Sequence, residues 1–256
     1  MAPPLPMDEI HPIVRPAAPA RLSRSAADTL LLVGPGVIWG ASFLFIAEGL
    51  RAVGPNGVTL ARILVGFVTL ALVPSARRAV PREAWRPIAL LGVLWMAFPL
   101  SMFPFAEQRV SSALTGMLNG ATPLFVAVVA AALARRAPPS GVRVGLAVGL
   151  AGVVLVAWPA LGEGRSSLDG VLMILAALAS YGFALNLARP LQLRYGALPV
   201  IFRAQAVALV LTAPLGAPEL LAGRFTAGPL LSLLALGALG TGLAYVLLAV
   251  AAGRLG

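Results

Sequence analysis

Five long runs of the sequence contain no charged residue, and they constrain the fold more than any other feature of the chain. The runs cover residues 87–106, 110–134, 144–162, 170–188 and 225–253. A helix needs about 20 apolar residues to cross the hydrocarbon core of a bilayer. The runs do not alternate between apolar and polar residues, as the strands of a membrane barrel do. Since lipid offers the backbone no hydrogen-bond partners, the sequence predicts an all-α integral membrane protein.

Turn signals divide the chain into about eight expected transmembrane helices. Such signals are residues 54–57 (Gly-Pro-Asn-Gly) and 138–141 (Pro-Pro-Ser-Gly). The expected helices cover residues 29–50, 55–74, 87–108, 112–134, 141–159, 168–188, 198–215 and 229–250. Residues 1–28 lack the basic start and apolar centre of a signal peptide, and we expect them to form a disordered cytoplasmic tail.

The basic residues predict the orientation in the membrane. The chain has a formal net charge of +10, and its 19 basic residues are all arginine. They lie between the apolar runs and form no stripe with interleaved aromatics, so they indicate membrane edges and not nucleic-acid binding. With a cytoplasmic N-terminus, 13 arginines fall in inner segments and 4 in outer ones. This bias predicts a multi-pass protein with a cytoplasmic N-terminus. The use of Arg alone, with a composition rich in Ala, Gly and Pro, suggests a high-GC bacterial genome and hence the bacterial inner membrane.

The chain partly matches itself at an offset of about 142 to 145 residues. The matched positions are Trp39-Gly40 with Tyr181-Gly182, Ala61-Arg62 with Ala204-Gln205, Thr69 with Thr212, Gly92 with Gly237, and Arg109 with Arg254. Five helices in the first copy force the second copy to enter the membrane inverted, a plan that places transporter sites at the repeat interface. We expect a five-helix repeat at 29–160 and an incomplete, three-helix repeat at 161–256. Either the chain is a fragment, or a partner supplies the missing wall.

Four segments resemble the EamA-like transporters of the drug/metabolite transporter superfamily. They are residues 39–43 (Trp-Gly-Ala-Ser-Phe), Ala61-Arg62, residues 105–114 leading into 118–125, and residues 145–155. The resemblance covers residues 38–256. It implies ten helices in two inverted repeats that move metabolites, amino acids or drugs out of cells. The sequence departs from the family at Arg135-Arg136, where many members carry a glutamate, and in lacking the last two helices.

The function expected from this resemblance is secondary transport, with export of small metabolites, amino acids or drugs by alternating access. The alternative is a non-transporting or partner-dependent helical membrane protein. Catalysis within a membrane needs a nucleophile with a base, paired carboxylates or a metal. The expected spans contain no His, Lys or Cys, and His11 lies in the tail. We therefore expect no enzyme, cofactor or metal site.

Polar and aromatic side chains at membrane depth are candidates for the substrate pathway, because polar groups are costly there. Arg62 is expected either to contact an anionic group or to extend its stem to the interface, the outcome favoured for Arg203. Pro123 cannot donate to the carbonyl of Asn119, so this residue is expected to contact substrate or a neighbouring helix. The candidates are Trp39, Phe43, Arg62, Phe98, Asn119, Pro123, Tyr181, Asn186, Gln205 and Tyr245. For single aromatics, ordinary packing is the alternative.

Two glutamates and one glycine stripe complete the prediction. Glu48 and Glu107, near the outer ends of helices, are candidates for a coupling proton or are simply interfacial. Arg109 is a candidate ion-pair partner of Glu107. Gly141, Gly145 and Gly149 in the fifth helix recur every four residues, which favours close helix packing or a homodimer through this helix. The expected partners are a small-molecule substrate and the lipid bilayer.

Overall fold

The computed structural model describes residues 26–162 and 165–255, and every regular element in these ranges is helical. Within these ranges, seven helical segments are long and apolar enough to cross a membrane by length and composition. This confirms the predicted all-α membrane fold. The eighth expected span, α2 (Pro55–Ala71), has 17 residues, or about 26 Å of helix, and is shorter than the other seven. The tail predicted at 1–28 lies outside the described residues up to position 25, and α1 already begins at Ala26.

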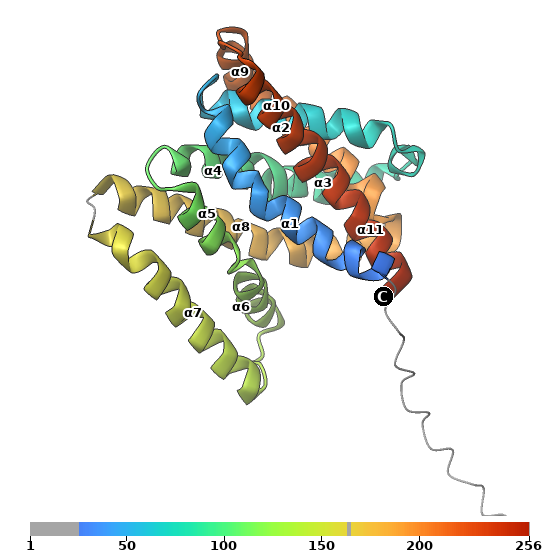
Figure 1. Cartoon of the computed structure of the whole chain (residues 1–256). Helices are drawn as coiled ribbons and strands as arrows, with labels where there is room; N and C mark the ends of the chain where they lie inside the picture. The colour runs from blue at the N-terminus through green and yellow to red at the C-terminus, as the bar shows by residue number, and fades with distance from the viewer. Residues whose placement is uncertain (1–25, 163–164, 256) are drawn as a thin grey trace, which may run out of the picture.

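The remaining elements follow in chain order. They are α1 (Ala26–Gly49), the 3₁₀ helices η1 (Pro74–Arg77) and η2 (Arg82–Ala84), α3 (Trp85–Leu91), the π-helical η3 (Gly92–Ala97), α4 (Phe98–Glu107), α5 (Ser112–Asn119), α6 (Thr122–Ala134), α7 (Ser140–Leu161), α8 (Arg165–Tyr195), α9 (Ala197–Leu221), α10 (Ala227–Ala235), the π-helical η4 (Leu236–Leu243) and α11 (Ala244–Leu255). Figure 1 shows them in one bundle, with α1 beside α11 and α7 along one edge.

Helix ends differ from prediction where charged residues continue a helix. The predicted helix 168–188 is α8, which runs on through Arg189 and Arg194 to Tyr195. The predicted helix 198–215 is α9, which extends to Leu221 with Pro214 and Pro218 inside it. An apolar run marks only the part of a helix that suits the hydrocarbon core, so it underestimates helices that project beyond it.

The predicted helix 112–134 is interrupted between α5 and α6. Ser111 begins α5 as its N-cap, with its Oγ accepting from the Leu114 backbone N–H at 3.3 Å. Pro123 stands at the start of α6, where its missing N–H does least harm. The Thr122 hydroxyl donates to the Asn119 carbonyl at 2.7 Å. This hydroxyl therefore satisfies the carbonyl that the proline leaves free.

Each half of the chain contains one π-helical segment at a matching position, η3 around Gly92 and η4 around Gly237. A side chain added at Gly92 would meet Val207 of α9, and one added at Gly237 would meet Val65 of α2. The third span of each half therefore packs against the second helix of the other half. Close packing of this kind requires glycine.

Hydrogen bonds repeat this reciprocal arrangement. Ser180 on α8 donates through its hydroxyl to the Leu94 carbonyl in η3 at 2.7 Å. Trp39 on α1 donates through its indole N–H to the Gly240 carbonyl in η4 at 2.9 Å. The first helix of each half thus binds the π segment of the other half. We propose the inverted two-repeat organisation expected from the sequence, and these exchanged contacts support it.

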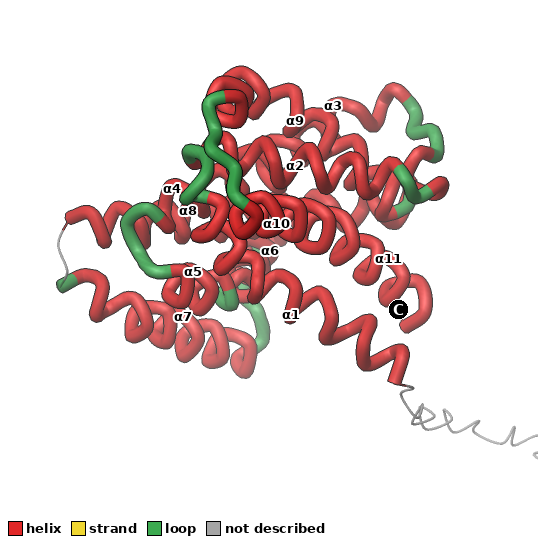
Figure 2. Tube along the Cα trace, turned by 45° about the horizontal axis from the view of Figure 1, so that its top comes forward, coloured by secondary structure: helices red, strands yellow, loops and turns green. Residues whose placement is uncertain are grey.

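The two second helices, α2 and α9, lie side by side and run antiparallel (Figure 2). Near the start of α2, Asn56 Nδ2 donates to Glu219 Oε1 near the end of α9 at 2.8 Å, and the Gly57 backbone N–H donates to Glu219 Oε2 at 2.7 Å. Near the opposite ends, Phe67 stacks on Phe202 with ring centroids 4.5 Å apart. Helices matched across an inverted repeat are expected to run in opposite directions.

The glycine-rich helix α7 contacts the rest of the bundle weakly. Gly149 packs against Leu124 of α6, but a side chain added at Gly141, Gly145 or Gly152 would meet no atom within 4 Å. Most of the large apolar side chains of α7 are exposed. The homodimer predicted through this helix stays a proposal. Three of its four glycines have open space beside them, where a second helix could pack.

Candidate functional site

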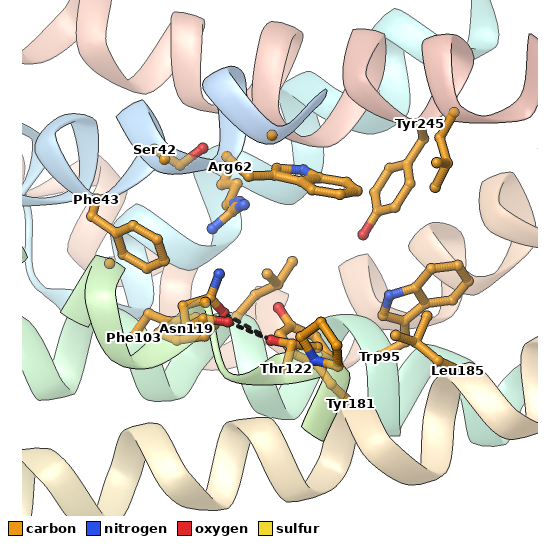
Figure 3. Close-up of a pocket in the computed structure, with 18 residues that line it drawn as sticks. Ser42, Phe43, Arg62, Trp95, Phe103, Asn119, Thr122, Tyr181, Leu185 and Tyr245 are labelled. Carbon is orange, nitrogen blue, oxygen red and sulfur yellow. Dashed lines mark hydrogen bonds between the residues drawn. The ribbon is translucent and has the colours of Figure 1, made fainter. Parts of the chain in front are cut away.

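A cavity of about 510 Å³ lies between α1, α2, α4, η3, α5, α6, α8 and α11. Figure 3 shows the side chains that surround it. Seven of the ten predicted pathway residues line the cavity, namely Trp39, Phe43, Arg62, Asn119, Pro123, Tyr181 and Tyr245. The lining residues that the sequence did not single out include Ser42, Trp95, Leu100, Phe103, Thr122, Leu185 and Leu248. Ser42 and Thr122 belong to the family-like segments, which was the one signal available for them.

Three predicted pathway residues lie outside this cavity. Phe98 has a side chain that is 38% exposed on the outside of the bundle. The wide turns of η3 place Trp95 and Leu100, five residues apart, on the cavity wall and turn Phe98 away from it. Asn186 instead donates across to the Val126 carbonyl on α6 at 3.0 Å. Gln205 is fully buried and donates to the Thr241 carbonyl at 2.7 Å.

Arg62 is held at the centre of the bundle and does not extend to the membrane surface. It is 7% exposed, and its Nε–H donates to the Thr241 hydroxyl in η4 at 2.8 Å. Gln205, which matches Arg62 in the repeat, binds the carbonyl of the same threonine. The ion pairs among residues 26–162 and 165–255 belong to Arg51, Arg194 and Arg254. No carboxylate in these ranges lies within ion-pair distance of Arg62, although the charge of Glu107 acts on the guanidinium from farther away.

Aromatic rings form two opposite parts of the cavity wall. Trp39 and Trp95 both pack edge-on against Tyr245, with ring centroids 5.7 and 5.5 Å away. We call these three residues the aromatic corner. Toward the other end, Phe103 contacts Phe43 at 5.4 Å and Tyr181 at 6.1 Å. Figure 3 shows Arg62 and Asn119 on opposite sides of the space.

The two candidate coupling glutamates lie outside the cavity and differ in their surroundings. Glu48 pairs with Arg51 at 3.0 Å. Glu107 Oε2 accepts from the Ser112 hydroxyl at 2.7 Å, while Oε1 is buried without a partner in the described part of the chain. Arg109 donates to the Phe105 carbonyl at 2.6 Å instead of pairing with Glu107. Glu107 borders a second hollow of about 390 Å³ next to α5 and α7.

A helical membrane bundle whose two halves enclose a cavity of this size, partly polar and partly aromatic, is typical of small-molecule carriers. Comparison with known protein families identifies which carriers these are. Residues 28–158, half of the chain, match the EamA-like transporter family. The chain belongs to this family.

Curated relatives agree with this assignment. The uncharacterized transporter YdfC of Bacillus subtilis (strain 168) is 28% identical over 173 residues, which cover 67% of this chain and 55% of the relative. The probable terminal-alkyne amino-acid exporter of Streptantibioticus cattleyicolor is 29% identical over 213 residues, which cover 81% of this chain and 68% of the relative. The chain thus spans between about half and two thirds of these relatives. No solved structure shows a significant match.

Proposed function

We propose that the protein is a secondary transporter that exports small metabolites, amino acids or drugs through the central cavity by alternating access. The observation that carries this proposal is the cavity itself. Its volume of about 510 Å³ falls within the range of small-molecule sites. Its wall combines many apolar side chains with a few polar groups, the composition that binding sites for such ligands share.

Alternating access is supported by the exchanged contacts between the halves. Trp39 and Ser180, on the first helices, bind the π segments of the opposite halves. Inverted halves of this kind can rock against each other around a fixed central site. If either π segment moved, the helix bonded to it in the other half would move with it. The movements of the two halves would thereby be coupled.

The proposed location is the bacterial inner membrane, with the N-terminus in the cytoplasm. The excess of 13 inner over 4 outer arginines supports the orientation. Both curated relatives named above come from bacteria.

We propose Glu107, rather than Glu48, as the residue that carries a coupling proton. Glu48 already has Arg51 as an exposed ion-pair partner. Glu107 has one buried carboxylate oxygen with no partner in the described ranges. A carboxylate placed out of water in this way needs a proton, a cation or a hydrogen-bond donor.

Flux through the purified chain in liposomes tests the proposed transport. A terminal-alkyne amino acid is a suitable probe, because a relative is named for it and the alkyne can be tagged for detection. We expect loss of the trapped probe to be faster than from protein-free liposomes. Thr122→Trp, which fills the cavity, should abolish this flux, whereas Leu155→Trp on the exposed face of α7 should not. Unchanged flux through a folded Thr122→Trp variant would contradict the proposal. A folded protein that transports none of the probes would favour the partner-dependent alternative.

A further inference from the structure

The cavity contains a hydrogen-bond arrangement that indicates the class of molecule it takes. Arg62 is the one charged residue among those described that line it. Its Nε–H is occupied by Thr241, but its two Nη groups form no hydrogen bond within the described ranges. A guanidinium has five N–H donors and no acceptor. A buried cation left in this state is costly unless an anion approaches it.

Asn119 presents a second set of unused donors on the opposite side of the cavity. Its side-chain oxygen receives a 3.5 Å contact from the Thr122 hydroxyl, while its Nδ2 makes no hydrogen bond with the described residues. Figure 3 shows this amide nitrogen directed toward the guanidinium of Arg62. Two donor groups therefore face each other across the cavity. An acceptor that can receive from both sides, such as a carboxylate, completes this arrangement.

The orientation of Arg62 is fixed before any ligand enters. Thr241 accepts from Arg62 Nε at 2.8 Å, and its own carbonyl is held by Gln205 at 2.7 Å. The Nε edge is thereby turned toward η4 and the Nη groups toward the cavity. A donor fork held in place in this way loses less freedom on binding than a mobile side chain does.

The aromatic corner indicates what the rest of the ligand is. Trp39, Trp95 and Tyr245 offer rings whose mutual packing leaves apolar surface on the cavity. The indole N–H of Trp39 is already bound to the Gly240 carbonyl, so this ring offers its face and edge, not its donor. Such a wall suits an apolar or aromatic body.

We propose that the cavity binds amphipathic monocarboxylates, with the carboxylate between Arg62 and Asn119 and the apolar body against the aromatic corner. This names the substrate class of the proposed transporter and rests on that function. No aspartate or glutamate lines the cavity in the described part of the chain. Organic cations of the same shape therefore meet an arginine and no counter-charge, and they are expected to bind poorly.

Three ligands with the same body test the proposal on the full chain in detergent: 3-phenylpropanoate, its neutral primary amide, and 3-phenylpropylammonium. Binding is measured by calorimetry and by the change in tryptophan fluorescence, to which Trp39 and Trp95 in the wall contribute. We expect the carboxylate to bind at least tenfold more tightly than the amide and the cation. Arg62→Gln should bring the carboxylate and the amide to within about threefold of each other.

Arg203→Gln is the matched control, because Arg203 lies outside the cavity and donates to the Pro199 carbonyl. It should keep the full preference. If Arg62→Gln does not fold, Asn119→Ala gives a second test and should weaken carboxylate binding at least threefold while leaving amide binding unchanged. Absent carboxylate binding, equal binding of the three ligands, or an equal loss in Arg203→Gln overturns the proposal. Binding is measured separately from flux, so the two proposals can fail separately. A protein that prefers carboxylates but transports nothing would contradict only the proposed function. A protein that transports substrates without preferring carboxylates would contradict only this inference.

Discussion

Thr241 is the residue on which the polar centre of the bundle depends. Its hydroxyl accepts from Arg62 and its carbonyl accepts from Gln205, two residues at matching positions of the proposed repeats. Thr241 is 1% exposed, so water cannot replace either bond. A single threonine thus orients the arginine and joins α2 to α9.

Thr241→Val should destabilise the protein and disorient Arg62. The Nε–H of Arg62 would be left buried without an acceptor, which costs about 1–3 kcal/mol. Thermal unfolding of the detergent-solubilised chain measures this loss. Thr212→Val is the control, since Thr212 bonds only to carbonyls of its own helix, Ala208 and Leu209. A Thr241→Val variant as stable as Thr212→Val would contradict this account.

Glu107→Gln should uncouple substrate movement from proton movement while leaving the fold intact. Glutamine keeps the shape and can still accept from Ser112, but it cannot carry a proton in exchange. A pH-sensitive dye trapped in liposomes should report substrate-dependent proton flow for the parent protein and none for the variant. Glu48→Gln should behave as the parent, because Glu48 is paired with Arg51 at the exposed edge. Equal proton flow in both variants would remove Glu107 from this role.

At the scale of elements, the two π-helical segments decide the packing of the bundle. Each holds a glycine whose hydrogen faces the opposite half, Gly92 against Val207 and Gly237 against Val65. The wider turns of η3 also bring Trp95 and Leu100, five residues apart, onto the same side of the helix, where both line the cavity. The interruption between α5 and α6 places Asn119 and Thr122 at the cavity in a similar way.

Gly237→Ala should lower the stability of the bundle. The added methyl would overlap Val65 and approach the Arg62 carbonyl at 2.9 Å, and overpacking of this kind costs about 1–3 kcal/mol. Gly145→Ala on α7 is the matched control, because nothing lies within 4 Å of its added atom. It should be neutral or stabilising by about 0.4–1 kcal/mol. Unfolding temperatures in the same detergent compare the two variants, and equal temperatures would argue against tight packing at Gly237.

The sequence predicted those features of the fold and the site whose signals lie within a single stretch of the chain. Charge-free runs predicted the helices, because crossing a bilayer demands them regardless of their neighbours. Costly polar groups such as Arg62 and Asn119 were recognisable from membrane depth alone. Trp95 and Phe103 were not, since they lie in apolar runs with no distinguishing neighbour. That Phe98 lies outside this cavity could not be foreseen, because a π turn leaves no simple mark on the residue pattern.

At the scale of the whole molecule, the two proposed repeats exchange contacts across the bundle, and one flank is exposed. The cavity lies where helices of both halves meet, and α7 stands at the edge with little of its surface buried. The absence of cysteine from the sequence makes the molecule well suited to labelling at single introduced thiols.

Ala79→Cys and Ala222→Cys test the proposed orientation. Both residues are exposed, at opposite ends of the bundle according to the order of spans. In intact cells, a membrane-impermeant maleimide should label Ala222→Cys and leave Ala79→Cys unreacted until the membrane is opened. The reverse pattern would place the N-terminus outside.

The exchanged glycine contacts also bear on how the protein is made. Gly92 meets its partner Val207 about 115 residues later in the chain, which corresponds to roughly 6 to 23 seconds of synthesis at common ribosome speeds. During that interval the third span would lie in the bilayer with the surface around Gly92 exposed to lipid or to an insertion chaperone. The third span would then pack fully only after the second half has been inserted. A ribosome that stalls midway would leave a membrane-inserted chain without these contacts, which membrane proteases could remove.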